Sequence, residues 1–296
     1  MKTLFFLAFA LIFLPVGAET PQPLTVNVPT TGFPGLDKYR AGHIAVYMND
    51  YGQLARYGEA DAALKGAAPA DTRVIFFGDS ITELWPIDKS FPGKQYVNRG
   101  IGGQTTSQML VRFRQDVVTL QPKATVILAG TNDIAGNTGP ISNENIEANL
   151  ASMVELAKAH AIRVVLSSIL PVHNYTPESQ EFFRSRPLER ILALNRWLQQ
   201  YCAANGVTYL DYFSAVVDEK GLLRRDLATD GLHPNTAGYA IMTRLAERAI
   251  EKILGESSPS VSMPFYNKKS FRPLQPSREA WLQRRGVIRR ANFAGP

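Results

Sequence analysis

Cysteine is nearly absent from the sequence. Cys202 is the only cysteine among 296 residues, so the chain can form no internal disulfide bond. It follows Leu194 and Leu198 at helical spacing, a pattern typical of a small buried side chain rather than of a reactive thiol. The stability of the fold must therefore come from its core, for which a chain of this length with 45% hydrophobic residues suffices.

Histidine is scarce as well, with four in the chain: His43, His160, His173 and His233. They form no His-x-x-x-His pair and no cysteine-rich cluster accompanies them, so we expect no metal site and no cofactor. His173 follows a β-rich run and either lines a pocket or has an ordinary role in a loop. The second interpretation is favoured.

The apolar run near the N-terminus is too short to span a membrane. It covers residues 4–14, whereas a spanning helix needs about 20 apolar residues. Lys2 precedes it and Val16-Gly17-Ala18 follow, which predicts a signal peptide (residues 1–18) that is cut after Ala18; an uncleaved anchor is the alternative. No cysteine follows the run, so a lipid anchor is not expected. The mature protein should be periplasmic or secreted, without stable membrane insertion.

The excess of positive charge is confined to the end of the chain. Residues 257–296 hold eight of the 32 basic residues but one of the 26 acidic residues. This basic segment contains several Pro and Gly residues and is expected to be a disordered tail, with a weak surface-binding tail as the alternative. Residues 19–256 carry 23 basic and 25 acidic residues, a balance that argues against a nucleic-acid partner for the main domain.

Residues 19–71 lie between the signal peptide and the main domain. They begin with a lead-in rich in Pro and Thr. A helix is predicted at Asn49–Leu64, where Tyr51 and Tyr57 share one face and Asp61 faces solvent. We expect this helix to pack on the domain that follows.

Residues 72–256 alternate short β-rich apolar runs with helical patterns. The expected strands are Val74–Phe77, Tyr96–Asn98, Thr125–Ala129, Val164–Ile169 and Val207–Leu210. The expected helices are Thr106–Leu120, Asn143–Ala161, Leu188–Asn205 and Thr236–Leu254. Almost continuous apolar strands between helices indicate a parallel sheet covered on both faces. We therefore predict an α/β fold, a three-layer α/β/α sandwich with a parallel, flavodoxin-like five-stranded sheet and a site at the carboxyl ends of its strands.

Ser80 lies where the first expected strand turns into a helix, in the segment Gly78-Asp79-Ser80. A hydroxyl at this position is exposed, and the amides at the start of the helix can face a developing oxyanion, so the position suits a nucleophile. An ordinary helix N-cap is the alternative. Thr82 stands where the α/β-hydrolase elbow would have its second glycine, so that motif is absent.

Two further segments follow the second and third expected strands. Gly100-Ile101-Gly102-Gly103 begins like a dinucleotide-binding loop, but Thr105 replaces the third glycine, so close approach to a small ligand is the better interpretation. Asn132 could donate its side-chain amide to an oxyanion or simply form a turn.

Asp230 and His233 lie in the segment Asp230-Gly231-Leu232-His233-Pro234, just before the last expected helix. In a tight turn, an Asp three residues before a His can accept from one ring nitrogen and leave the other facing a serine. A solvated loop histidine is the alternative, but the four segments together favour catalysis, because each lies at a strand end or in the closing loop.

These four segments together resemble the SGNH, or GDSL-type, hydrolase superfamily, whose four blocks supply Ser, Gly, Asn and His. The similarity covers roughly residues 72–254 and is greatest to the branch that includes the platelet-activating-factor acetylhydrolase catalytic subunits and many bacterial carbohydrate esterases. The resemblance implies that Ser80 is the nucleophile, His233 the base and Asp230 the acid that orients it. It also implies an oxyanion hole made of the Ser80 and Gly103 amides and the Asn132 side chain, with Gly102 as the alternative to Gly103.

The expected function is that of a secreted serine esterase that hydrolyses acetyl esters, on a small molecule or a polysaccharide, through an acyl-enzyme. The loops at residues 133–145 and 171–187 are largely polar, which favours a carbohydrate over a long acyl chain. Tyr175, Phe182 and Phe183 could stack on a sugar ring or merely pack their loop. Two alternatives are a lysophospholipase or thioesterase and a catalytically inactive carbohydrate-binding module.

Overall fold

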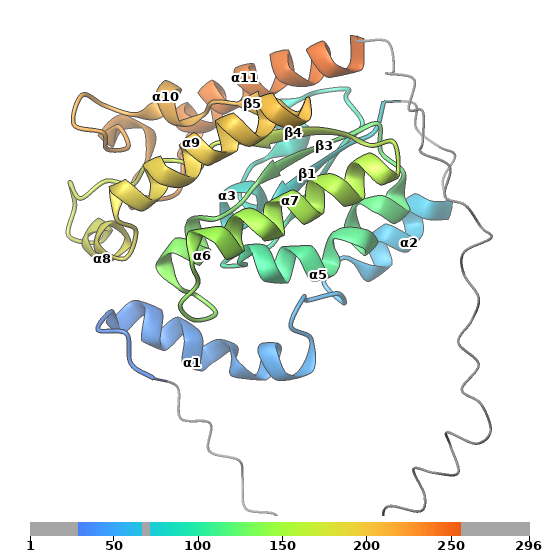
Figure 1. The fold of residues 1–296 in the computed structure, drawn as a ribbon. Helices are drawn as coiled ribbons and strands as arrows, with labels where there is room; N and C mark the ends of the chain where they lie inside the picture. The colour runs from blue at the N-terminus through green and yellow to red at the C-terminus, as the bar shows by residue number, and fades with distance from the viewer. Residues whose placement is uncertain (1–28, 67–71, 256–296) are drawn as a thin grey trace, which may run out of the picture. The chain divides into compact units, whose positions relative to one another are not determined.

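A computed structural model describes residues 29–66 and 72–255. Its centre is a sheet of five parallel strands in the order β2-β1-β3-β4-β5 (Figure 1). The strands are β1 (Val74–Gly78), β2 (Tyr96–Gly100), β3 (Ala124–Leu128), β4 (Arg163–Ser167) and β5 (Thr208–Leu210). This is the strand order of a flavodoxin-like sheet, and the predicted fold class is confirmed.

Helices cover both faces of this sheet, which makes the three layers. The α-helices of the main domain are α3 (Ser80–Glu83), α4 (Ile87–Ser90), α5 (Thr106–Asp116), α6 (Thr131–Ala135), α7 (Asn143–Ala159), α8 (Ser179–Arg184), α9 (Leu188–Asn205), α10 (Phe213–Val216) and α11 (Thr236–Gly255). Two 3-10 turns lie at Val118–Leu120 and Arg225–Leu227. Each predicted strand and helix of this domain lies within a few residues of an observed one.

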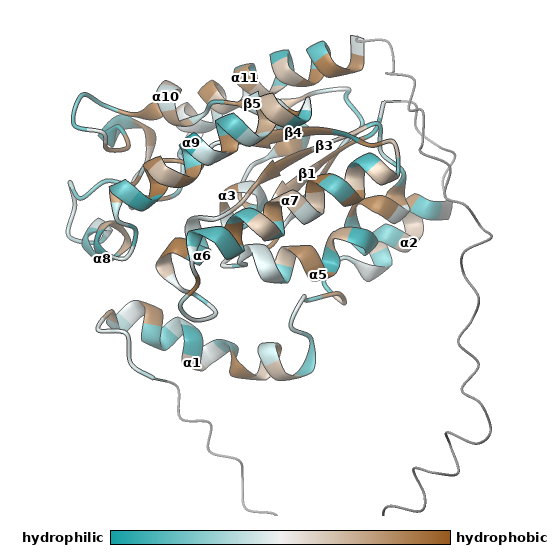
Figure 2. Cartoon of the chain, viewed as in Figure 1, coloured by the Kyte–Doolittle hydropathy of each residue, from teal (hydrophilic) through white to brown (hydrophobic). Residues whose placement is uncertain are grey.

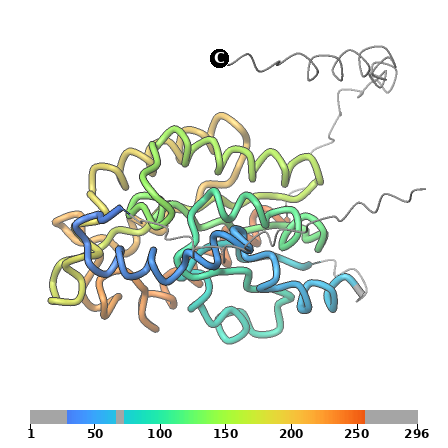
Figure 3. The backbone as a smooth tube through the Cα atoms, turned by 90° about the horizontal axis from the view of Figure 1, so that it is seen from below, coloured from blue at the N-terminus to red at the C-terminus, as the bar shows by residue number. Residues whose placement is uncertain are grey.

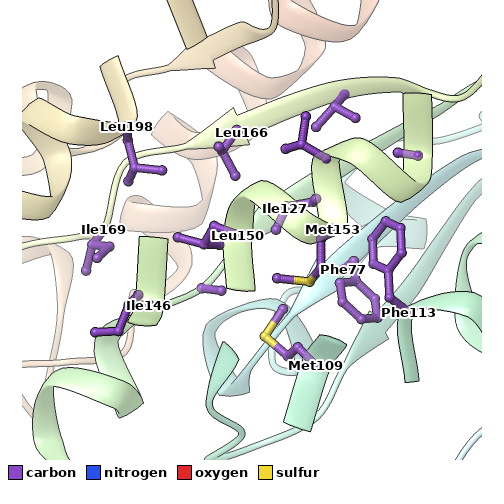
Figure 4. Packing of buried hydrophobic residues seen from close by; sticks show 14 of the residues in the cluster. Phe77, Met109, Phe113, Ile127, Ile146, Leu150, Met153, Leu166, Ile169 and Leu198 are labelled. Carbon is purple, nitrogen blue, oxygen red and sulfur yellow. The ribbon is translucent and has the colours of Figure 1, made fainter. Parts of the chain in front are cut away.

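The central strands β1 and β3 are almost entirely apolar because every residue in them is buried under one helical layer or the other (Figure 2). In β1, Ile75 and Phe77 pack with α5, α7 and α9, while Val74 and Phe76 pack with α3 and α11. Figure 4 shows the first of these clusters, where Phe77 lies against Phe113 with ring centroids 5.2 Å apart. A sheet buried on both faces leaves only its ends accessible, so a site can form there.

The segment before the domain differs from the prediction. The structure has two helices, α1 (Pro34–Asn49) and α2 (Gly58–Gly66), where we expected one at Asn49–Leu64. The chain turns between them because the carboxylate of Asp50 accepts hydrogen bonds from the amides of Leu54 and Ala55. The predicted single helix is therefore wrong, although its second half coincides with α2.

Asp61 on α2 is buried rather than turned to solvent, which corrects a second expectation. Its Oδ1 accepts hydrogen bonds from two nitrogens of Arg99 on β2, at 2.6 and 2.8 Å. A charged residue is buried here because its partner, 38 positions along the chain, is buried beside it.

The proposed signal peptide (1–18), the start of the lead-in and the basic tail (257–296) lie outside the described residues. Within the part of the chain that the structure does describe, no helix is both long and apolar enough to cross a bilayer.

Candidate active site

Ser80 is the first residue of α3, directly after β1. From β1 the chain goes first to β2 on one side and then to β3 on the other, so the strand order reverses at this point of the sheet. Its neighbour Asp79 is the N-cap of α3 and accepts a hydrogen bond from the amide of Ile81 at 3.0 Å. This cap fixes the start of the helix and so the position of Ser80. Ligands of such sheets bind in the crevice outside the strand ends at this switch point.

Ser80, His233 and Asp230 form a hydrogen-bonded series. The Oγ of Ser80 lies 2.9 Å from Nε2 of His233, and Nδ1 of His233 lies 2.6 Å from Oδ2 of Asp230. The other carboxylate oxygen accepts the backbone amides of Leu232 and His233 at 2.9 and 2.8 Å. The tight turn runs through Gly231, whose φ of +87° favours glycine. This geometry can remove the proton of the serine hydroxyl.

Hydrogen bonds keep Asp230 ionised. Partial burial alone would raise its pKa, but the side chain of His233 and the two backbone amides outweigh that effect and hold the pKa well below its usual range. A carboxylate that stays charged can orient the imidazole and stabilise its protonated form.

Asn132 is the second residue of α6, at the end of β3, and is buried. Its Nδ2 donates to the carbonyl of Gln104 at 3.1 Å, and its Oδ1 accepts from Nη2 of Arg186 at 3.2 Å. These two contacts fix which way the amide faces. Since Nδ2 carries two hydrogens, one remains for a ligand in the pocket.

The two candidate glycines of the loop after β2 differ in their contacts. The amide of Gly102 donates to Oε2 of Glu83 at 2.8 Å, so its hydrogen is already engaged. Gly103 has a φ of +74°, and its carbonyl accepts from Nδ2 of Asn137 at 2.8 Å. Gly103 also lines the pocket that contains Ser80, so it is the better placed of the two to donate to a ligand.

A pocket of about 420 Å³ is lined by Ser80 and His233 and by two candidate oxyanion donors, Gly103 and Asn132. It is lined by Gly35, Leu36, Tyr39, Ser80, Gly103, Asn132, Ala135, Asn137, Glu178, Glu181, Phe182, Ser185, Arg186, Leu232 and His233. The lining comes from strand ends on one side and from α1 and α8 on the other.

The three aromatic residues expected to bind a sugar are separated in the structure. Phe182 lines this pocket, with its ring edge-on to His233 at 6.2 Å between centroids. Phe183 packs against the core instead. Tyr175 lines a different surface depression and donates to Asp218 at 2.5 Å. His173 is fully buried, with its Nε2 3.2 Å from the Ala228 carbonyl, which is the favoured loop role.

Sequence reasoning missed Arg186, which lines the pocket although it is buried. Its guanidinium donates to Thr131 Oγ1 at 3.0 Å and to Asn132, and it lies 5.3 Å from the ring centre of Phe182. Burial lowers its pKa to about 10, so it stays charged at neutral pH. Tyr39 was missed too, because it lies on a helix that the sequence did not predict. An arginine in a polar loop gives no signal of burial.

Across residues 29–66 and 72–255, no group of three or more His, Cys, Asp or Glu side chains lies close enough together to hold a metal ion.

Residues 76–241 match the model of the GDSL-like lipase/acylhydrolase family. This segment covers more than half of the chain and contains Ser80, Asn132 and His233. The chain belongs to this family. The resemblance inferred from the four motifs is confirmed, and the protein is an ester hydrolase of the GDSL type.

Similar proteins support the same assignment. A GDSL-like lipase from Bacteroides thetaiotaomicron VPI-5482 is 39% identical over 69% of this chain and 99% of its own, with a TM-score of 0.63. An acetylxylan esterase from Geobacillus stearothermophilus is 28% identical over 53% of this chain and 73% of its own length. An uncharacterized lipoprotein, YqeF, from Bacillus subtilis (strain 168) is 34% identical over 38% of this chain; the chain spans about half of that protein, 54% of its length.

Proposed function

We propose that the protein is a serine esterase that removes short acyl groups, acetyl foremost, from a carbohydrate. The observation that carries the mechanism is the series Ser80 Oγ to His233 Nε2 to Asp230, with distances of 2.9 and 2.6 Å, whose first two members line a pocket.

In the proposed mechanism, His233 takes the proton of Ser80 as Oγ attacks the ester carbonyl carbon. The negative charge that develops on the carbonyl oxygen is stabilised by the amides of Ser80 and Gly103 and by Nδ2 of Asn132. His233 then gives the proton to the leaving alcohol, and an acyl-enzyme remains on Ser80. Water, deprotonated by His233, attacks this ester and releases the carboxylic acid.

The carbohydrate part of the proposal rests on two indirect observations. The chain is similar to an acetylxylan esterase at 28% identity. Phe182 offers an aromatic face or edge in the pocket, a feature suited to a sugar ring. Export through residues 1–18 remains a prediction, which N-terminal sequencing of the mature protein tests.

Hydrolysis of p-nitrophenyl acetate by purified protein tests the mechanism. Ser80→Ala and His233→Ala should each lower kcat by about 10⁴ to 10⁶ with the fold intact, because triad members act as one unit. Ser152→Ala on α7 and His160→Ala after it are matched controls outside the pocket and should retain activity. Near-normal turnover by folded Ser80→Ala would refute the assignment. Release of acetate from acetylated xylo-oligosaccharides, compared with a simple acetate ester, tests the carbohydrate part.

A further inference from the structure

Helix α1 forms one wall of the catalytic pocket, although it lies outside the segment that matches the family model. Figures 1 and 3 show it crossing one side of the domain, beside α6. Glu181 on α8 accepts the amides of Gly35 and Leu36 at 3.0 and 2.8 Å, and so holds the start of the helix. Arg40 donates to the carbonyl of Gly136 at 2.9 Å, which holds its middle.

Tyr39 extends from α1 to the oxyanion donors. A methyl group built on Gly103 would lie 2.0 Å from the Tyr39 hydroxyl, so the phenol occupies the space that a side chain at position 103 would need. The ring stacks on His43 with centroids 4.0 Å apart, which holds it in place. Burial raises the pKa of Tyr39, so the hydroxyl stays neutral.

A second cavity of about 700 Å³, here called the α1 groove, lies beneath the same helix. Its lining includes the apolar side chains of Leu36, Ile44, Met48 and Ile134, together with polar ones such as Arg40 and Arg190. The α1 groove and the catalytic pocket share Leu36, Ala135 and Asn137 in their linings. The two spaces therefore adjoin, with Leu36 in the wall between them and Tyr39 on the catalytic side.

The α1 groove lies away from His233. His233 lines the catalytic pocket but not the groove, and the leaving oxygen must face the Nε2 atom of His233 to receive its proton. The oxyanion faces Gly103 and Asn132. The four bonds of the tetrahedral carbon point in different directions, so the acyl chain is directed away from His233, the direction in which the α1 groove also lies.

We propose that Tyr39 and Leu36 determine the acyl-chain length that the enzyme accepts. They close the catalytic pocket against the α1 groove, so that acetyl fits and a longer chain meets the wall. Shortening either side chain joins the two spaces and gives a longer acyl chain an apolar lining to occupy. This inference rests on the proposed esterase function and specifies its substrate range.

The test compares kcat/KM for p-nitrophenyl acetate, butyrate and octanoate. Tyr39→Ala and Leu36→Ala should each raise the ratio of octanoate to acetate by at least tenfold over wild type. Tyr39→Phe keeps the ring and should keep the wild-type ratio. Tyr51→Ala removes a tyrosine that hydrogen-bonds Ser107 and lines neither space, so it too should keep the ratio.

An unchanged ratio in both alanine variants, with wild-type melting temperatures and measurable acetate hydrolysis, would overturn the proposal while leaving the esterase function intact. A wild-type preference for octanoate would also overturn it, because no barrier would then exist. Absence of any ester hydrolysis by the wild type would refute the proposed function, and this proposal with it.

Discussion

Arg186 has a buried guanidinium that forms no direct ion pair within the described residues, although the carboxylates of Asp79, Asp230 and Glu181 lie near enough to favour its charged form. Burying a charge without a direct ion pair is costly. The contacts of Arg186 explain why a charge is buried here. Its guanidinium donates to Oδ1 of Asn132 and so keeps Nδ2 of Asn132 directed into the pocket. Its positive charge also lies on the side where negative charge develops during acyl transfer.

Replacing Arg186 should therefore slow the chemical step through Asn132. Asn132→Ala should lower kcat by about 10² to 10³ with little change in KM, because its amide acts on the transition state. Arg186→Met should lower kcat at least tenfold in the wild-type background but much less in the Asn132→Ala background, since neighbours that act together are not additive. Steady-state kinetics of the four proteins of this cycle measure the coupling.

Arg190→Met provides the matched control for that cycle. Arg190 lies on α9, outside the catalytic pocket, and donates to the carbonyls of Ile134 and Ile141 and to Asn143. Its loss should affect stability rather than kcat. Equal losses of kcat from Arg186→Met with and without Asn132 would show that Arg186 only supports the fold.

Among the elements, the strands were predictable and α1 was not. The runs Val74–Phe77 and Thr125–Ala129 are apolar at successive positions, which is the signal of a strand buried on both faces. In α1 only Leu36 is buried, so the helix lacks the apolar stripe on which periodicity depends. It is held instead by hydrogen bonds to Glu181 and Gly136, which lie about 100 residues or more away in the chain.

The same contrast between local patterns and distant contacts explains which residues of the site could be predicted. Ser80, Asn132 and His233 follow strands or precede a helix within short motifs, so local sequence was enough to predict them as site residues, and the structure brings them to one pocket. The wall that faces them comes from α1 and α8, and no local pattern pairs these elements. Asp61 was likewise placed on the wrong side because its partner Arg99 is remote in sequence.

The ion pair of Asp61 and Arg99 attaches α2 to β2, and its removal should destabilise the whole domain. Both side chains are buried, with 1% and 5% of their area exposed, so Asp61→Ala leaves an unpaired guanidinium in the interior. Breaking such a pair costs about 3–5 kcal/mol. Urea unfolding followed by circular dichroism measures the loss. Glu59→Ala changes an exposed carboxylate on the same helix and should alter the free energy of unfolding by about 0.5 kcal/mol or less.

The candidate site is assembled from separate parts of one sheet. β1, β2 and β3 end beside one another, so Ser80, Gly103 and Asn132 meet although they are far apart in sequence. Two aspartates at these strand ends, Asp79 and Asp133, are buried with the loops that they brace: Asp79 caps α3, and Asp133 accepts the amide and the hydroxyl of Thr106.

Burying these carboxyls makes the stability of the molecule depend on pH. Burial raises the pKa of Asp79 and that of Asp133 to about 6 each, and the hydrogen bonds from Ile81 and Thr106 offset this only in part. In the unfolded chain an aspartate has a pKa of about 3.9. Between pH 4 and pH 6 the folded protein therefore holds protons that the unfolded chain has released. Raising the pH through this window lowers the free energy of unfolding.

Asp230 changes the free energy of unfolding with pH in the opposite direction, because its pKa is depressed in the folded state. The stability that it contributes is present above about pH 4 and is lost as the pH falls further. The two effects therefore act in different pH windows, and single variants can separate them.

Urea denaturation of wild type, Asp79→Asn and Asp133→Asn at half-unit steps from pH 3 to pH 8 measures these contributions. As the pH rises from 4 to 6, the two variants should each lose less stability than wild type. The slope of the free energy of unfolding against pH should be smaller by up to about 1.4 kcal/mol per pH unit, because the folded variant binds one proton fewer in this window. Asp230→Asn should leave the slope in this window unchanged and reduce the loss below pH 4. Asp88→Asn, at an exposed position on α4, should give a curve parallel to wild type throughout. Curves for Asp79→Asn and Asp133→Asn that stay parallel to wild type from pH 4 to pH 6 would show that neither carboxyl binds its proton more tightly in the folded protein.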